Sequence, residues 1–277
     1  MPANPATWRL ITQEQGTDGI WNMAVDEALL YYIAEGISLP TLRLYSWDRP
    51  TVSLGIAQPA SDLNLDRITQ KGWGLVRRPT GGRAILHTDE ITYSVTASQQ
   101  NPLLTGNLLE SYHQISAALL AALNILGVDA NGEREYPDDQ STKSPNPICF
   151  NTPSNYEITT DGKKLIGSAQ ARKYGGILQH GAIPLSGNIT RLTDVLTFEN
   201  EFEKEKAVSS LVSRACTLAD RLGYPPLWPE VATALQKGFE TAFEINFTSL
   251  PLSAEELTLA TQLAENKYSS AEWTFRR

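Results

Sequence analysis

Cysteine is scarce in this chain of 277 residues, which contains only Cys149 and Cys216. Two cysteines in so long a chain make no disulfide framework, which is typical of a reducing compartment such as the cytoplasm. Long apolar runs are also missing, since none approaches the roughly 20 residues that span a bilayer. Residues 1–7 lack a basic segment followed by an apolar core, so we expect no export signal and no membrane partner.

An excess of positive charge is likewise missing. The 23 lysines and arginines against 31 acidic residues give a formal net charge of −8, which argues against nucleic acid as a partner. No CxxC, HExxH or Walker pattern occurs in the sequence. We therefore expect neither a metal site nor a P-loop nucleotide site. The length fits one large domain, or one domain with an appendage.

One basic stretch stands out against this acidic background. Residues 76–87 read Val-Arg-Arg-Pro-Thr-Gly-Gly-Arg-Ala-Ile-Leu-His, which predicts a short strand, a turn and a second strand. Gly81 and Gly82 give the turn backbone freedom and let a ligand approach the main chain. The three arginines around it suit carbonyls, carboxylates and phosphates. The same residues are also consistent with an ordinary basic β-hairpin.

The remaining pattern predicts strands and helices without regular alternation. We expect strands at 8–12, 41–47, 51–54, 90–97, 156–160, 164–168 and 177–185. We expect helices at 18–35, 63–72, 108–126, 190–198, 211–222, 231–242 and 254–266, and a loop at 131–147. Glu27 falls inside the apolar stripe of the first helix, where it needs a partner such as an arginine of the glycine turn, or lies at the margin of the stripe. This order favours an α+β fold with a mixed, largely antiparallel sheet flanked by helices.

A second stretch carries a thiol and an amine. Cys149 follows the proline-rich loop, and Lys164 begins a strand that continues into Gly167-Ser168-Ala169. A neighbouring ammonium favours the reactive thiolate, so the pair is suited to acyl transfer. The alternatives are that Cys149 is a small buried hydrophobe and that Lys164 is a solvated hairpin lysine.

Together these motifs resemble the lipoate-protein ligase and octanoyltransferase family. Residues 77–87 are similar to its Arg-Arg-x-Thr/Ser-Gly-Gly signature, 162–170 with 179–181 to its lysine signature, and 22–28 to its first helix. The resemblance implies the biotin/lipoate protein ligase catalytic-domain fold, similar to that of class II aminoacyl-tRNA synthetases. It implies a catalytic domain at 1–250, with a helical extension at 251–277 packed on the same domain.

The family has branches that activate the acyl group differently. The segment Cys149-Phe-Asn-Thr-Pro-Ser-Asn-Tyr-Glu157 resembles one octanoyltransferase branch, in which a cysteine holds the acyl group. Arg83 replaces a third glycine that is frequent in the ligases, which restricts the approach of a nucleotide phosphate. We therefore expect octanoyl (or lipoyl) transfer from acyl carrier protein through a Cys149 thioester, without a cofactor. The alternatives are an ATP- and Mg-dependent lipoate ligase, an amidotransferase between lipoyl domains, or a non-catalytic acyl-binding relative.

The resemblance also implies the site. Cys149 and Lys164 are the expected catalytic residues, with Lys164 a candidate base if burial lowers its pKa. The expected substrate-binding residues are Arg77, Arg78, Thr80, Gly81, Gly82, Arg83, His87, Gly167, Ser168, Ala169, His180 and Gly181. The expected acyl-tunnel residues are Leu75, Val76, Ile85 and Tyr93, with plain core packing as the alternative. Expected partners are octanoyl-acyl carrier protein and the lipoyl domains of 2-oxoacid dehydrogenases or the glycine cleavage H protein, and the expected compartment is the cytoplasm.

Overall fold

The computed structural model describes residues 5–132 and 157–277. The strands are β1 (Ala6–Thr17), β2 (Thr41–Trp47), β3 (Thr51–Leu54), β4 (Gly74–Arg77), β5 (Ile85–His87), β6 (Glu90–Ser98), β7 (Ile158–Thr160), β8 (Lys163–Lys173), β9 (Gly176–Pro184) and β10 (Ile245–Ser249). The helices are α1 (Gly19–Ala34), η1 (Ala60–Asp62), α2 (Leu65–Gln70), α3 (Leu108–Ile125), η3 (Ile189–Val195), α4 (Glu201–Arg214), α5 (Leu218–Leu222), α6 (Trp228–Phe243), α7 (Ala254–Leu263), η4 (Ala264–Tyr268) and α8 (Ala271–Thr274).

The described strands form two sheets. The larger has seven strands in the order β10-β1-β2-β6-β9-β8-β7, and the smaller has the order β4-β3-β5. In the larger sheet β10, β1 and β2 are parallel, whereas the pairs from β2 through β6, β9 and β8 to β7 are antiparallel. The prediction of a mixed, largely antiparallel sheet is confirmed.

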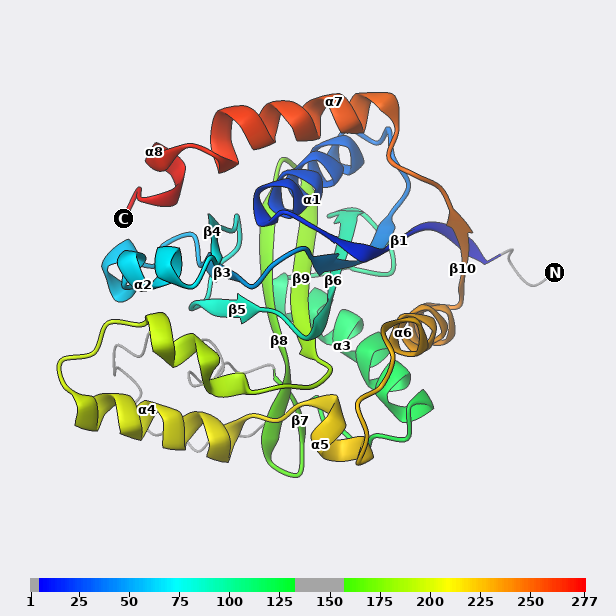
Figure 1. The fold of residues 1–277 in the computed structure, drawn as a ribbon. Helices are drawn as coiled ribbons and strands as arrows, with labels where there is room; N and C mark the ends of the chain where they lie inside the picture. Colours follow the sequence, from blue (N-terminus) through cyan, green and yellow to red (C-terminus); the bar gives the residue numbers. More distant parts are fainter. Residues whose placement is uncertain (1–4, 133–156) are drawn as a thin grey trace.

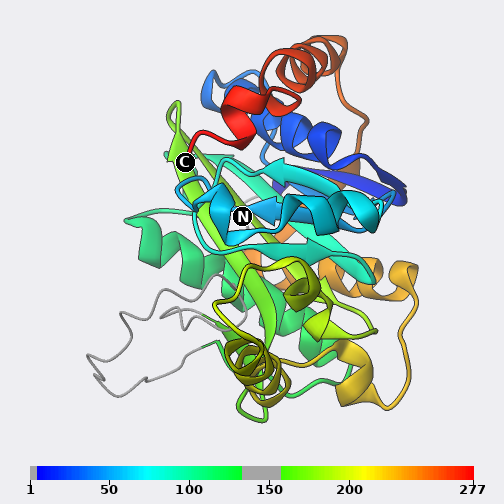
Figure 2. The same cartoon turned by 60° about the vertical axis from the view of Figure 1, so that its left-hand side comes forward.

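Helices cover both faces of the larger sheet. Strand β2 shows the division, because alternate side chains of a strand point to opposite faces. Leu42 and Leu44 join the main hydrophobic core with residues of α3 and α6, whereas Arg43 and Tyr45 contact α1. Helix α7 lies along the outer side of α1 (Figure 1). The smaller sheet and α2 lie beside α1 rather than on the α3 side (Figure 2).

The basic stretch is not a β-hairpin. Strand β3 lies between β4 and β5, so Val52 is opposite both Leu75, in parallel register, and Leu86, in antiparallel register. The glycine turn therefore crosses the end of β3, where Thr80 O accepts from Ile56 N at 2.8 Å. The sequence showed two strands around a turn, but a third strand from earlier in the chain inserts between them.

The expected helix at 211–222 is interrupted for a tertiary reason. Helix α4 ends at Arg214 and α5 begins at Leu218, because Ala215 forms a parallel bridge with Lys164 of β8. Cys216 N donates to Lys164 O at 3.0 Å, and the Cys216 side chain is buried in the main core. This bridge fixes the start of β8, where the expected catalytic lysine lies.

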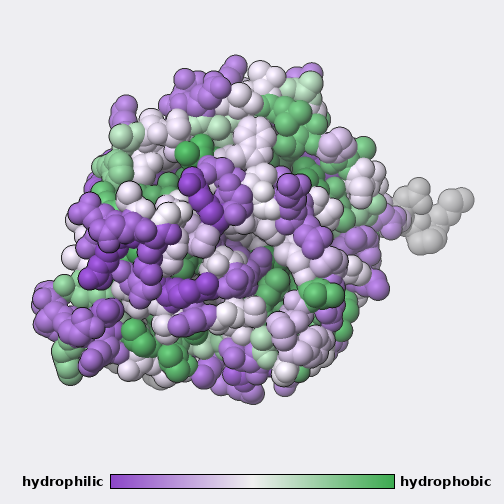
Figure 3. All heavy atoms as spheres, viewed as in Figure 1, coloured by the Kyte–Doolittle hydropathy of each residue, from purple (hydrophilic) through white to green (hydrophobic). Residues whose placement is uncertain are grey.

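The C-terminal segment packs on α1. Ala260 of α7 is buried among Val25, Ala28 and Leu29, and the expected division of the chain at residue 250 stays a prediction. Hydrophilic side chains gather on the left of the face in Figure 3, over α2 and β5. Within the described residues, no helix has the length and apolar character needed to cross a membrane.

Glu27 links α1 to this segment, and the prediction of an arginine partner from the glycine turn is wrong. The buried carboxylate accepts from Lys173 Nζ at 2.9 Å, from Tyr268 Oη at 2.5 Å and from Lys267 Nζ. Burial acts to raise the pKa of Glu27, but hydrogen bonds and the charge of Lys267 outweigh it and lower the pKa to about 2. The unfolded state therefore binds the Glu27 proton more readily than the folded state.

This shift predicts an acid-labile contribution to stability. Because the pKa is lowered from 4.5 to about 2, the stabilisation is present above pH 4.5 and is lost as the pH falls toward 2. Its size is about 3 kcal/mol. Urea unfolding of the wild type and Glu27→Gln across this window should show the difference between their unfolding free energies shrinking by this amount. If the unfolding free energies of the two proteins instead change in parallel with pH, Glu27 is not the source of this stabilisation.

Candidate active site

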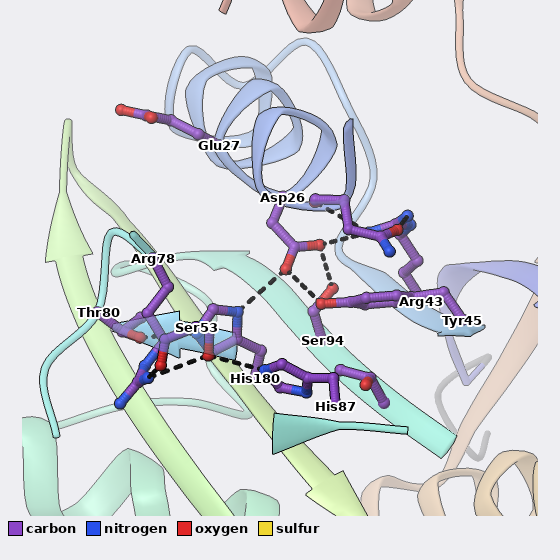
Figure 4. Close-up of polar contacts among 12 residues, drawn as sticks. Asp26, Glu27, Arg43, Tyr45, Ser53, Arg78, Thr80, His87, Ser94 and His180 are labelled. Atoms are coloured by element: carbon purple, nitrogen blue, oxygen red, sulfur yellow. Dashed lines mark hydrogen bonds and ion pairs between the residues drawn. The ribbon is translucent and has the colours of Figure 1, made fainter. Parts of the chain in front are cut away.

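A buried carboxylate on α1 organises one row of the larger sheet. Arg43 of β2 is opposite Ser94 of β6, which is opposite His180 of β9, so the three side chains share one face. Asp26 reaches down to this row (Figure 4): Oδ1 accepts from Arg43 Nη1 at 2.9 Å and from Ser94 Oγ at 2.8 Å. Asp26 Oδ2 lies 3.1 Å from His180 Nδ1. Four elements therefore meet at this one carboxylate.

The same contact connects the sheet to the glycine turn. Burial acts to raise the pKa of Asp26, but the His180 hydrogen bond and the Arg43 charge outweigh it and lower the pKa. Burial lowers the pKa of His180 despite Asp26, so the imidazole is neutral near pH 7. Its Nδ1–H then donates to Asp26, and Nε2 accepts from Thr80 Oγ1 at 2.7 Å. Thr80 is thereby held by a chain of hydrogen bonds that begins at Asp26 on α1 and passes through His180.

A parallel chain joins the smaller sheet to β6. His87 Nδ1 lies 2.7 Å from Glu90 Oε1, and His87 Nε2 lies 2.7 Å from Ser53 Oγ. The His87 ring stacks on Trp47 with a centroid separation of 3.9 Å. These contacts fix the His87 ring in position and orientation between the two sheets.

A pocket of about 350 Å³ lies between the two sheets. Its floor is the next row of the larger sheet, in which Tyr45, Thr92, Ala182 and Gly167 are opposite one another. Two of the four, Gly167 and Ala182, are small residues, which leave space above the sheet. The lining residues are Met23, Tyr45, Trp47, Ser53, Arg78, Ile85, His87, Thr92, Gly167, Ser168, Ala169, His180, Gly181 and Ala182.

Several polar side chains line the pocket, but their hydrogen-bonding groups already have partners within the protein, so the pocket presents an apolar surface. Ser53 donates to His87 and accepts from Arg78, and Thr92 Oγ1 donates to Glu90. The remaining polar side chains bond in the same way within the protein: Tyr45 to Asp26, Trp47 to Thr92, Ser168 to Tyr93, and His180 to Asp26 and Thr80. A ligand there meets aromatic faces and carbon rather than unsatisfied donors, and an aliphatic chain suits such a surface.

Lys164 is buried near the start of β8, three residues before the pocket-lining Gly167, and is paired with a carboxylate. Its side chain is 4% exposed, and Nζ donates to Glu157 Oε1 at 2.6 Å. The alternative of a solvated hairpin lysine is therefore wrong. Glu157 was missed as a functional candidate, although it ends the motif that begins at Cys149. Cys149 itself lies outside the described residues, so its role and its relation to Lys164 stay predictions.

The structure separates the expected substrate-binding residues into two groups. Those that line the pocket are Arg78, His87, Gly167, Ser168, Ala169, His180 and Gly181. Those that do not are Arg77, Thr80, Gly81, Gly82 and Arg83. Of the expected tunnel residues only Ile85 lines it, while Leu75, Val76 and Tyr93 pack in hydrophobic clusters. The described residues contain no cluster of three or more His, Cys, Asp or Glu side chains placed to hold a metal.

The arginines of the turn have structural partners. Arg77 is fully buried and donates to the carbonyls of Gly55, Gln58 and Thr274, which ties the turn to the C-terminal helix. Arg78 donates to Gly81 O at 2.7 Å and so stabilises the glycine turn that follows it. These contacts give the two residues a supporting role that the sequence did not show.

The two glycines of the turn differ in conformation. Gly82 has φ +91°, and a Cβ there would lie 2.8 Å from Arg78 Nη2, whereas a Cβ on Gly81 would meet nothing within 4 Å. Gly82→Ala should therefore destabilise the protein by about 1–2 kcal/mol, and Gly81→Ala should change stability little. Urea unfolding midpoints measure both. Equal effects of the two substitutions would contradict the geometry of the turn.

The fold and site define a class of enzyme: a two-sheet α+β domain with an apolar pocket suited to holding an acyl chain, and with a buried lysine on one of the strands that line it. Residues 18–240 match the model of the lipoyl protein ligase A/B catalytic domain. The chain is 41% identical to octanoyltransferase LipM of Carboxydothermus hydrogenoformans and 37% identical to octanoyltransferase LipM of Bacillus subtilis. Each match covers 98% of this chain and 99% of the relative.

Solved structures agree with this assignment. The bi-partite lipoate protein ligase of Thermoplasma acidophilum superposes with a TM-score of 0.80 at 25% identity, covering 98% of this chain and 96% of that one. A lipoate-protein ligase A bound with ATP gives 0.79 at 27% identity, covering 97% and 98%. The chain belongs to the lipoyl protein ligase A/B catalytic-domain family, and the predicted family, fold and acyltransferase class are confirmed.

Proposed function

We propose that this protein transfers an octanoyl group from acyl carrier protein, through a thioester on Cys149, to a lysine of a lipoyl domain. The observation that carries the proposal is the apolar, internally hydrogen-bonded pocket, which is lined by Gly167, Ser168 and Ala169 of the same strand that holds buried Lys164. The identity of the acyl group is inferred from the relatives, which are named octanoyltransferases. The lipoylation system of the Thermoplasma relative, which includes an E2 lipoyl domain, indicates the class of acceptor.

Two exchanges make up the reaction. The Cys149 thiolate attacks the octanoyl thioester, so that one C–S bond forms, another breaks and the carrier thiol leaves. The acceptor amine then forms the amide C–N bond as the Cys149 C–S bond breaks, and the sulfur takes a proton. Exchange between thioesters is nearly isoenergetic, so no ATP is needed.

Lys164 acts in this scheme as a donor to the developing oxyanion. The adjacent Glu157 carboxylate, 2.6 Å away, favours a charged ammonium, which is suited to stabilising negative charge. This differs from the role of base that the sequence suggested, because a base must be neutral. Backbone amides near Gly82 and at Ser168–Ala169 are further candidate donors.

The test is transfer without ATP. Octanoyl carrier protein and a lipoyl domain are incubated with the protein and no nucleotide, and the mass of the lipoyl domain is followed. We expect octanoylation that disappears in Cys149→Ala. Dependence on ATP, with release of AMP, would instead identify an ATP-dependent ligase, the activity suggested by the ATP-bound structural relative.

A further inference from the structure

A second pocket of about 510 Å³ adjoins the first. Ile85 of β5 lines both pockets. In strand β9, Ala182 lines the first pocket and Pro184 the second. One layer of side chains therefore separates the two pockets, on the flank where β8 begins.

The second pocket differs from the first in chemistry. Leu86, Leu192 and Leu211 give it apolar walls, and Asp89 and Glu90 bring two carboxylates. Among the described lining residues the one basic side chain, Arg191, is already paired with Asp89. The described lining thus carries a net negative charge of one, which favours a cation over a phosphate-bearing ligand.

Glu90 belongs to the wall between the pockets. Its side chain is 5% exposed, and Oε1 holds His87 Nδ1 at 2.7 Å and Thr92 Oγ1 at 2.6 Å. His87 and Thr92 line the first pocket, whereas Glu90 lines the second. The buried carboxylate of Glu90 therefore lies between the second pocket and the first pocket, which would hold the acyl chain.

Leu211 links this pocket to the lysine site. Its carbonyl accepts from Ala215 N at 2.9 Å, and Ala215 forms the bridge with Lys164. The wall of the second pocket is therefore connected through the backbone to the residue that, in the proposed function, contacts the acyl carbonyl.

We propose that the second pocket receives the side chain of the acceptor lysine, an inference that rests on the proposed function. The tetramethylene stem packs on the leucine walls, and the carboxylates of Asp89 and Glu90 attract and orient the ammonium. In the transfer step the amine nitrogen forms the C–N bond as the C–S bond breaks. Of the two protons that the ammonium sheds, one goes to the leaving sulfur and one to water.

The experiment separates the two half-reactions in the full chain. Acyl loading is followed by intact mass after addition of octanoyl carrier protein, and transfer is followed by adding a lipoyl domain to the loaded protein. Ile189→Trp fills the second pocket from a half-buried position. Val212→Trp is the matched control, because Val212 is 53% exposed and is not a lining residue.

Ile189→Trp should slow transfer at least 10-fold and leave loading within about 2-fold, while the control changes neither rate. Asp89→Asn, at a side chain 44% exposed, should raise the lipoyl-domain concentration needed for half-maximal transfer several-fold without affecting loading. Slower loading in these variants would show that the second pocket binds the octanoyl donor rather than the acceptor lysine. Unchanged transfer would show that the pocket has no role in the reaction. Either result overturns the inference. Absence of loading in the unmodified protein would instead contradict the proposed function.

Discussion

Lys164→Met should lower the rate of octanoyl transfer by about 10²–10³-fold, the usual cost of removing one donor to an oxyanion. The physical reason is the ammonium, which is buried and held 2.6 Å from Glu157 and which, in the proposed function, donates to the oxyanion. The rate is measured by the mass of an octanoylated lipoyl domain under saturating carrier protein.

A second variant separates this effect from folding. Lys164→Met leaves the buried Glu157 carboxylate without its ammonium, which costs about 3–5 kcal/mol of stability. The double variant Lys164→Met with Glu157→Gln removes the charge, so its unfolding free energy should recover while its activity stays low. Recovery of activity together with stability would show that Lys164 is structural only.

Asp26→Asn should destabilise the protein by about 3–5 kcal/mol. Arg43 is 1% exposed and its charge is paired with Asp26, so the substitution leaves a buried guanidinium without an anion. Asparagine also offers one acceptor oxygen in place of two, which weakens the contact with His180 Nδ1–H and therefore the chain that holds Thr80. Urea unfolding of the purified protein measures this loss.

Asp18→Asn is the matched control on the same helix. Asp18 pairs with Arg49 at the surface, where both side chains are more than one third exposed, and exposed pairs contribute about 0–1 kcal/mol. Asparagine also caps a helix as well as aspartate does. If Asp18→Asn lowers the free energy of unfolding as much as Asp26→Asn does, burial of the Asp26–Arg43 pair does not explain the destabilisation.

The local part of the fold was predictable because it depends on periodicity. Alternation over 90–97 and helical spacing over 108–126 reflect faces buried against one core, and both elements form close to the expected bounds. The insertion of β3 between β4 and β5 was not predictable, since nothing in the turn encodes a partner strand from elsewhere in the chain. Strand β10 was missed for a similar reason: it is short and is defined by its pairing with β1.

The site was predictable only where motif residues themselves line the pocket. His180, Arg78 and Gly181 were found from their motifs, whereas Ser53 lies in a short apolar strand with no signal of function. Glu27 was noticed and Asp26 was not, yet the register of three strands makes Asp26 the centre of the polar row. Such roles follow from contacts between distant segments, which a single sequence does not display.

The most direct test of the account is the intact mass of the protein after incubation with octanoyl carrier protein in the absence of ATP. The account predicts one added octanoyl group, located on Cys149 by peptide mapping and released when a lipoyl domain is added. An unmodified mass, with acylation of the lipoyl domain only when ATP is supplied, would contradict it.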